Sequence, residues 1–230
     1  MSLAERFDAL LIDFYGTISA GDREAVEDAC KRVVEVCGLP LKPAEFAVRW
    51  GKRFFERIEQ SNHEAFRTLH ECELASLADT LAEFGETADP GPFVADLEAY
   101  WRNPPVYADA LEFLRNVDVP VCCVSNADTG PLLAAIEKHG LRFDAVVTSE
   151  MARCYKPDPL IFETALRLLG VRAERAAHVG DSMHSDIGGA SLAGLSTVWL
   201  CRDSRIHDIG DHRGDWKISS LADFFDVVLA

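Results

Sequence analysis

Five short apolar runs of strand length are spread along the chain. They lie at 8–13, 119–125, 143–148, 175–180 and 195–200. Between the later runs, patterns typical of helices occupy 107–116, 129–139, 157–169 and 184–193. Strands that alternate with helices of about ten residues indicate βαβ units. The pattern therefore predicts an α/β fold, a doubly wound, Rossmann-like parallel sheet with helices on both faces.

The segment 18–105 has a different pattern, with helix-like stretches and no convincing strand. The four stretches fall near 22–36, 43–60, 63–85 and 91–102. In the second stretch, large apolar residues recur every four positions from Phe46 to Ile58 and form one stripe. We therefore expect a helical insert over 18–105, placed after the first strand, and an α/β core formed by 1–17 and 106–230.

Composition narrows the class of protein and its partners. The chain has 230 residues, of which 48% are hydrophobic, so it is not a disordered chain. It carries 38 acidic and 23 basic residues, a net charge of −15. A surface this acidic repels phosphate backbones and anionic lipid, so we expect no nucleic-acid partner and no membrane partner. A small anionic substrate is still compatible, because a few cations can reverse the field inside a cleft.

Cysteine usage and hydropathy predict the compartment. The seven cysteines are scattered without a CxxC pair, and an odd count in a chain of this length favours a reducing compartment. No apolar stretch is long enough to span a bilayer, and the first residues lack the pattern of a signal peptide. We therefore expect a cytoplasmic protein, as a monomer or homodimer.

Polar residues follow the predicted strands at the edge of the sheet where such folds bind ligands. The candidates there are Asp13, Tyr15, Gly16, Thr17, Ser125, Asn126, Lys156, Asp181 and Asp186. A single carboxylate at a strand end is more often a helix cap or a turn former. That explanation is much weaker for the whole set, so we expect these residues to form one site.

The chemistry that this set supports is nucleophilic and metal-assisted. Asp13 and Asp181 offer the oxygen ligands that suit Mg²⁺, and Asp13 can also attack an electrophile to form a covalent intermediate. Lys156 would balance the charge on the nucleophile and the substrate. Thr17 or Ser125, with main-chain N–H groups, could hold the oxygens of the transferred group.

Four short motifs in this order resemble those of the haloacid dehalogenase (HAD) superfamily: Asp13-x-x-Gly16-Thr17, Ser125-Asn126, Lys156-Pro157 and Gly180-Asp181 followed by Asp186. Their order and spacing match over nearly the whole chain. The resemblance implies a Rossmann-like catalytic core formed by 1–17 and 106–230, and it identifies the insert over 18–105 with the family's mobile helical cap. It also implies a covalent aspartyl intermediate and a Mg²⁺ site formed by Asp13, the main-chain carbonyl of Tyr15, Asp181 and Asp186.

Tyr15 keeps two branches of that family open. Family phosphatases usually carry a second Asp at this position as acid and base, a role that a phenol with a pKa near ~10 cannot take without a large shift. Asp-x-Tyr-Gly-Thr is instead similar to the 2-haloacid dehalogenases, in which halide leaves unprotonated. The motif around Asp181 and Asp186 is similar to the metal-binding form of the phosphatases. We therefore expect a Mg²⁺-dependent hydrolase of a small phosphate monoester with a good leaving group. The alternatives are a 2-haloacid dehalogenase and a weakly active binding or regulatory protein.

Basic residues of the predicted second cap helix are further candidates. Arg49, Arg53 and Arg57 repeat every four residues, which a solvated helix face explains. A guanidinium could also reach from the cap and clamp a carboxylate or phosphate, so we include Arg49 and Arg53 as candidate substrate-binding residues. In the core, Asp128 is expected to cap the helix that begins near Thr129.

Overall fold

The computed structural model of the protein describes residues 2–202 and 213–230. Its strands are β1 (Ala9–Ile12), β2 (Val121–Ser125), β3 (Ala145–Thr148), β4 (Ala176–Gly180), β5 (Ser196–Leu200) and β6 (Trp216–Ile218). Within these residues they form one sheet in the order β3-β2-β1-β4-β5-β6, and each neighbouring pair is parallel. The predicted parallel α/β sheet is confirmed.

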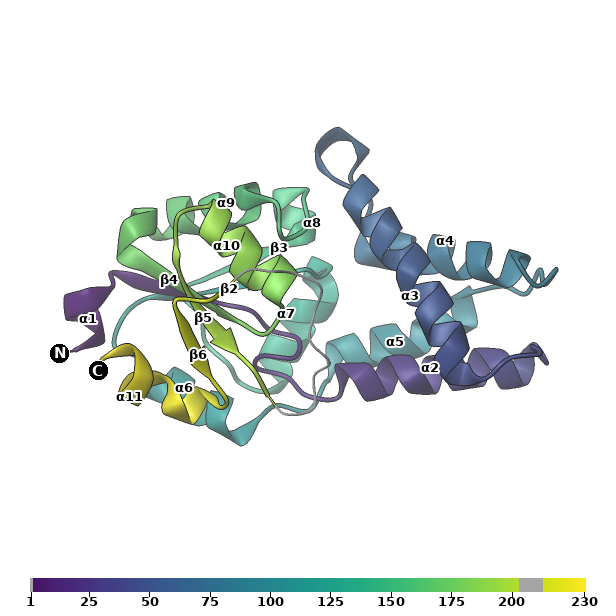
Figure 1. Cartoon of the computed structure of the whole chain (residues 1–230), viewed down its shortest axis with the longest axis horizontal. Coiled ribbons are helices and arrows are strands. Elements are labelled where there is room, and N and C mark those ends of the chain that lie inside the picture. Colours follow the sequence, from purple (N-terminus) through teal and green to yellow (C-terminus); the bar gives the residue numbers. More distant parts are fainter. Residues whose placement is uncertain (1, 203–212) are drawn as a thin grey trace.

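Helices cover both faces of this sheet (Figure 1). They are α1 (Leu3–Arg6), α6 (Ala108–Asn116), α7 (Thr129–Lys138), α8 (Ser149–Ala152), α9 (Pro159–Leu169), α10 (Gly189–Leu192) and α11 (Phe224–Val228). Successive residues of β1 point to opposite faces. Leu10 and Ile12 belong to a core cluster with Phe113 of α6 and Phe224 of α11, whereas Leu11 packs in a second cluster with Phe162 of α9. Burial on both faces explains why the strands are continuous apolar runs.

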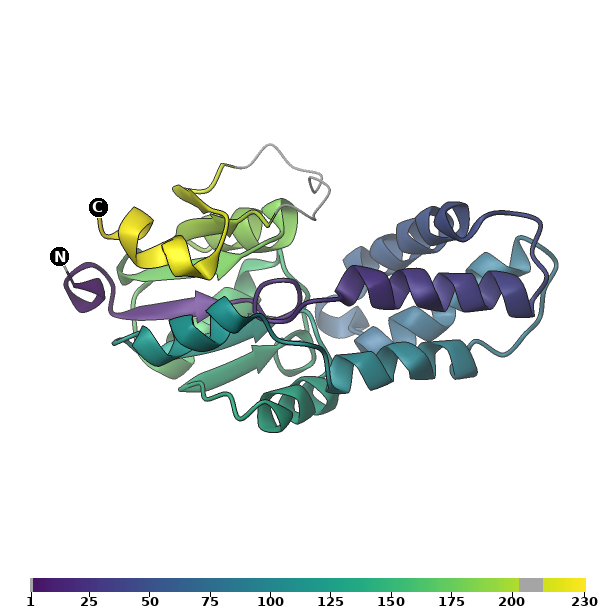
Figure 2. The ribbon, with the colours of Figure 1, turned by 90° about the horizontal axis from the view of Figure 1, so that it is seen from below.

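The remaining helices form a lobe beside the sheet, at one end of the molecule (Figure 2). They are α2 (Asp22–Val36), α3 (Pro43–Gln60), α4 (Leu69–Ala82) and α5 (Gly91–Arg102). Phe46 and Trp50 of the apolar stripe pack with Leu77 of α4 in a core that belongs to this lobe. Ile58, at the end of the stripe, packs instead with Tyr155 of the sheet lobe. None of the helices in the described residues is both long and apolar enough to cross a membrane.

Several elements differ from the sequence-based expectations. The helix expected over 63–85 begins only at Leu69, because Thr68 and Glu71 form a capping box there. The helix expected over 184–193 starts as a π-helical turn, Met183–Gly188, that leads into α10. The pattern did not predict β6, α1, α8 or α11. Each of these has only three to five residues, too few to show a period.

Candidate active site

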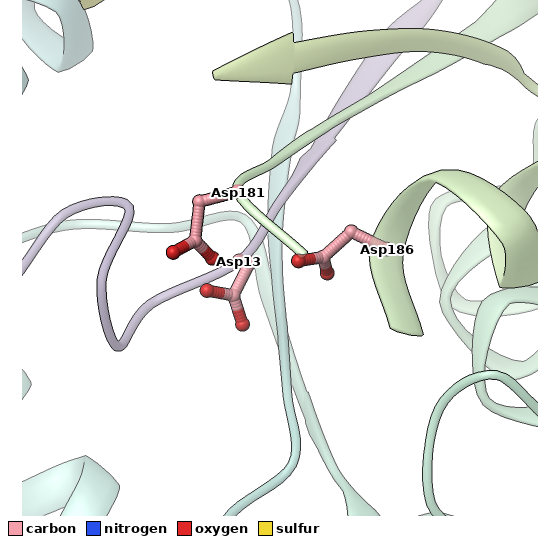
Figure 3. Close-up of side chains that lie close together, drawn as sticks. All are labelled: Asp13, Asp181 and Asp186. Atoms are coloured by element: carbon pink, nitrogen blue, oxygen red, sulfur yellow. The ribbon is translucent and has the colours of Figure 1, made fainter. Parts of the chain in front are cut away.

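Three carboxylates meet at the carboxyl edge of the sheet. Asp13 follows β1 and Asp181 follows β4, its neighbour in the sheet, so parallel pairing brings the two side chains together (Figure 3). Asp186 joins them from the π-helical turn after β4. One oxygen of each lies within 4.8 Å of the others, and all three residues are buried. Buried negative charge at this density requires cationic partners.

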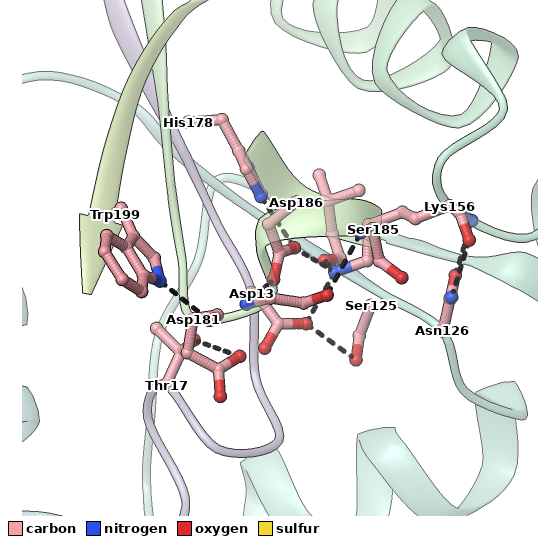
Figure 4. Close-up of polar contacts among 12 residues, drawn as sticks. Asp13, Thr17, Ser125, Asn126, Lys156, His178, Asp181, Ser185, Asp186 and Trp199 are labelled. Atoms are coloured by element: carbon pink, nitrogen blue, oxygen red, sulfur yellow. Dashed lines mark hydrogen bonds and ion pairs between the residues drawn. The ribbon is translucent and has the colours of Figure 1, made fainter. Parts of the chain in front are cut away.

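Lys156 supplies one of these cations. Its Nζ donates to Oδ1 of Asp13 at 2.7 Å, to Oδ1 of Asp186 at 2.6 Å and to the main-chain oxygen of Val124 at 3.0 Å (Figure 4). Burial alone would lower the pKa of Lys156, but the two carboxylates outweigh burial and raise the pKa, so the ammonium stays charged. Burial raises the pKa of Asp13, and Lys156 opposes that shift.

Asp186 is fully engaged by protein donors. Its Oδ1 accepts from Lys156 and, at 2.9 Å, from Nε2 of His178, while its Oδ2 accepts the N–H of Ser182 at 3.0 Å. Burial would raise the pKa of Asp186, but Lys156 and His178 outweigh burial and hold it well below the usual range. Gly180 makes room for this arrangement, because a Cβ there would lie 2.2 Å from Cγ of Asp186. In this structure Asp186 orients Lys156, and the metal-binding role expected of Asp186 remains a prediction.

Asp13 and Asp181 are better placed to share a cation. Oδ1 of Asp13 accepts from Lys156 and, at 3.5 Å, from Oγ of Ser125. No described residue donates to its Oδ2, which leaves that atom available to a metal or an electrophile. Thr17 Oγ1 donates to Oδ1 of Asp181 at 3.3 Å. Gly16, with a φ of 86°, takes the left-handed conformation that turns the chain between Asp13 and Thr17.

Asn126 supports the loop that carries Lys156. Its Nδ2 donates to the main-chain oxygen of Lys156 at 3.1 Å, and its Oδ1 accepts the N–H of Lys156 at 2.7 Å. The amide thus has a main-chain partner at both ends, although Asn126 also lines the cleft. The structure places Asn126 as a positioning residue for Lys156 more than as a direct substrate ligand.

Tyr15 points its phenol at the helical lobe. The hydroxyl donates to the main-chain oxygen of Trp101 in α5 at 2.7 Å, and the two rings pack edge to face at 4.9 Å. Burial raises the pKa of Tyr15 far above its ordinary value. A phenol with this pKa and this partner cannot serve as the acid that the sequence lacks at position 15.

Arg49 and Arg53 do not reach the cleft. Both pair with Glu83, just beyond α4, and the guanidinium of Arg49 also lies over the ring of Phe84. Residues of α3 recur on one face every three or four positions, and the face toward the cleft carries Val48 and Phe55 instead. The two arginines therefore form ion pairs on the flank of α3, and they do not line the cleft.

A cleft of about 1080 Å³ lies between the two lobes and includes Asp13, Lys156 and Asp181 in its lining. Glu73 of α4 also lines it, and sequence reasoning missed this residue. The sequence did contain a sign of its burial, because Glu73 lies on the same helix face as Leu77, which is buried.

Asp128 has a different partner from the one expected. It does not cap α7 with its side chain. Instead its Oδ1 and Oδ2 accept the N–H groups of Leu69 and His70, at 2.7 and 2.9 Å, and so cap α4 from the other lobe.

Comparisons with known proteins agree with this arrangement. The family model for haloacid dehalogenase-like hydrolases matches residues 7–194. A ribulose-1,5-bisphosphate 5-phosphatase of Halopiger xanaduensis is 31% identical over 155 residues, which cover 60% of this chain and 65% of that protein, slightly less than two thirds of its length. Haloacetate dehalogenase H-2 of a Moraxella species is 25% identical over 206 residues, which cover 86% of this chain and 87% of that protein.

The fold is shared with solved structures of the same kind. A Bacillus subtilis HAD-hydrolase bound to magnesium matches with a TM-score of 0.77 at 22% identity, covering 96% of this chain and 98% of that one. At this identity the likeness concerns the fold alone. The family model, however, spans most of the sequence and includes the strands that carry Asp13, Ser125 and Asp181. The protein therefore belongs to the haloacid dehalogenase-like hydrolases.

Proposed function

We propose that this hydrolase cleaves a small phosphate monoester with the help of Mg²⁺ and a covalent intermediate on Asp13. The observation that carries the proposal is the cluster of three buried carboxylates, Asp13, Asp181 and Asp186, which place one oxygen each within 4.8 Å of the others. The ammonium of Lys156 pairs with Asp13 and Asp186. Carboxylate oxygens clustered in this way are the ligands that Mg²⁺ prefers, and this supports a metal-assisted reaction over a dehalogenation without metal.

The donor set fits a hard divalent cation. Asp13 and Asp181 would hold it, with the main-chain carbonyl of Tyr15 as the third protein ligand that the family resemblance implies. When bound, Mg²⁺ would neutralise phosphate charge and let an anionic nucleophile approach. Asp186 would act through Lys156, because its own oxygens already accept hydrogen bonds.

The reaction would have two steps, phosphorylation of Asp13 and hydrolysis of the phosphorylated carboxylate, and the protein's own residues support both. An oxygen of Asp13 attacks phosphorus and the ester oxygen leaves, so that Asp13 becomes phosphorylated. Water attacks the same phosphorus and releases inorganic phosphate and the free carboxylate. Lys156 fixes the orientation of Asp13 in both steps. Thr17 and Ser125 lie beside the two carboxylates, where their hydroxyls can donate to phosphoryl oxygens.

The leaving group must depart without a proton from position 15, because the phenol of Tyr15 is buried and donates to Trp101. The departing oxyanion takes its proton from water instead. This favours esters whose leaving groups are stable anions, such as aryl phosphates. We propose that the helical lobe acts as the cap that selects among them.

A 2-haloacid dehalogenase is the second candidate, and two observations favour it. Tyr15 stands where phosphatases of the family carry an acid, and the match to haloacetate dehalogenase H-2 covers nearly the whole chain. In that reaction Asp13 would displace halide from carbon, and water would then hydrolyse the resulting ester.

Calorimetric titration with Mg²⁺ tests the proposal. The wild type should show one binding site, which Asp181→Asn removes. Asp226→Asn is the control, because Asp226 is exposed on α11, far from the carboxyl edge of the sheet, and should leave binding unchanged. A wild-type protein that binds no Mg²⁺ would contradict the proposal and favour the dehalogenase.

A further inference from the structure

A smaller recess adjoins the catalytic cleft, between α4, α5 and the segment that follows β2. Its volume is about 280 Å³. Four residues line both the recess and the cleft: Tyr15, Leu69, Glu73 and Trp101. A substrate held at Asp13 could therefore extend one end into the recess.

Glu73 is a buried carboxyl of this recess, and it is only half satisfied. The residue is 5% exposed, and its Oε1 accepts from Nε1 of Trp101 at 3.0 Å. No described residue donates to Oε2. Burial raises the pKa of Glu73 to about 8; the bond from Trp101 opposes that shift, and the nearby Asp128 and Glu98 add to it. Burying such a group costs folding free energy, and groups of this kind are concentrated at ligand sites.

The other charged groups of the recess already have partners. Both oxygens of Asp128 accept main-chain N–H groups at the start of α4. Glu98 accepts from Arg102 through Oε1, and its side chain is 33% exposed. Nδ1 of His70, which has no hydrogen-bond partner among the described residues, lies 3.9 Å from Oε2 of Glu98. Among the carboxyl groups of the described recess, Glu73 is the buried one with an oxygen to offer.

The walls of the recess favour a cation over a neutral group. The rings of Tyr15 and Trp101 stand against each other at 4.9 Å, and aromatic rings attract cations through their faces. Two further carboxylates, Asp128 and Glu98, contribute a negative field. An ammonium group would meet the open oxygen of Glu73 and remain attracted by the whole lining.

Building on the proposed function, we propose that the recess binds a protonated amine of the substrate through Glu73. The substrate would then be an aryl phosphate that carries an ammonium group at the end away from phosphorus. Its apolar body would lie against α3, where Val48 and Phe55 are exposed and line the cleft. The phosphoryl group would lie at Asp13.

A matched pair of substrates tests this inference. Tyramine phosphate and tyrosol phosphate have similar aryl leaving groups and differ in carrying an ammonium or a hydroxyl. With Mg²⁺ present, kcat/KM should be about tenfold higher for the amine, as expected for a charge-assisted hydrogen bond. Glu73→Gln should bring the ratio of the two values towards one. Asp79→Asn, an exposed acid of the same helix outside the recess, should leave the ratio unchanged.

The outcomes separate this inference from the proposed function. Equal hydrolysis of both esters by the wild type, or a preference that survives Glu73→Gln, would overturn the amine site while the phosphatase stands. If neither ester is hydrolysed, the phosphatase itself fails. Calorimetric binding of the two corresponding phosphonates then tests the amine site. Tighter binding of the amine that Glu73→Gln removes would support the amine site, whereas equal binding of the two phosphonates would overturn it.

Discussion

Replacing Glu73 with glutamine should stabilise the protein, and increasingly so as pH rises. The folded state holds the carboxyl proton to about pH 8, whereas the unfolded chain loses it near the ordinary pKa of 4.5. Between these values the folded state binds more protons than the unfolded state, so the free energy of unfolding falls as pH increases. Glutamine has no proton to lose, and its side-chain oxygen can still accept from Trp101.

The size of the effect follows from the two pKa values. They differ by about 3.5 pKa units, and one unit corresponds to about 1.36 kcal/mol, so the cost of the buried carboxyl reaches about 5 kcal/mol above pH 8. Below about pH 4.5 the carboxyl is protonated in both states and this difference vanishes. The advantage of Glu73→Gln should therefore grow from near zero to several kcal/mol over this window.

Urea unfolding followed by tryptophan fluorescence measures the difference in free energy of unfolding between Glu73→Gln and the wild type. The measurement is made at about pH 5 and at about pH 9. Titrations elsewhere in the chain cancel when the variant is compared with the wild type at the same pH. Asp79→Asn is the control, since its exposed ion pair with Arg57 should contribute about 1 kcal/mol or less. A Glu73→Gln advantage that is the same at both pH values would refute the reasoning.

Further predictions concern the catalytic edge and the contact between the lobes. Asp13→Asn should keep the fold, because Lys156 retains its bond to Asp186, but abolish turnover; a variant with most of its activity would exclude Asp13 as nucleophile. Lys156→Met leaves two buried carboxylates without their cation and should lower the free energy of unfolding by about 3–5 kcal/mol, as measured in urea. Asp128→Ala removes both acceptors at the start of α4 and should cost about 1–2 kcal/mol, measured as a lower melting temperature. Tyr15→Phe should change kcat on p-nitrophenyl phosphate little, and a loss of about a hundredfold would show that the hydroxyl takes part in the chemistry.

The sequence was sufficient for strands β1 to β5 of the sheet and for the residues at its carboxyl edge. Apolar runs locate strands because a parallel sheet is buried on both faces. Parallel pairing then brings Asp13, Ser125 and Asp181 to one edge whatever the details of the loops. These inferences need only local pattern and a general property of the fold.

Partners of individual side chains were beyond the same reasoning. The spacing of Arg49 and Arg53 defines a helix flank, but Glu83, which pairs with both, lies thirty or more residues away, just after α4. Asp128 looked like a cap for the next helix and instead caps α4 in the other lobe. Asp186 belongs to the carboxylate cluster that could hold a metal ion, but its contacts with His178 and Lys156 were not apparent from the sequence. Each partner depends on how the lobes and loops pack, which local spacing does not encode.

The most direct test of the proposed activity compares two reactions on one preparation. Phosphate release from p-nitrophenyl phosphate and chloride release from 2-chloropropionate are measured with Mg²⁺ and again with excess EDTA. We expect phosphate release that EDTA abolishes and added Mg²⁺ restores, and no chloride release. Chloride release that is indifferent to EDTA, without phosphate release, would contradict the account.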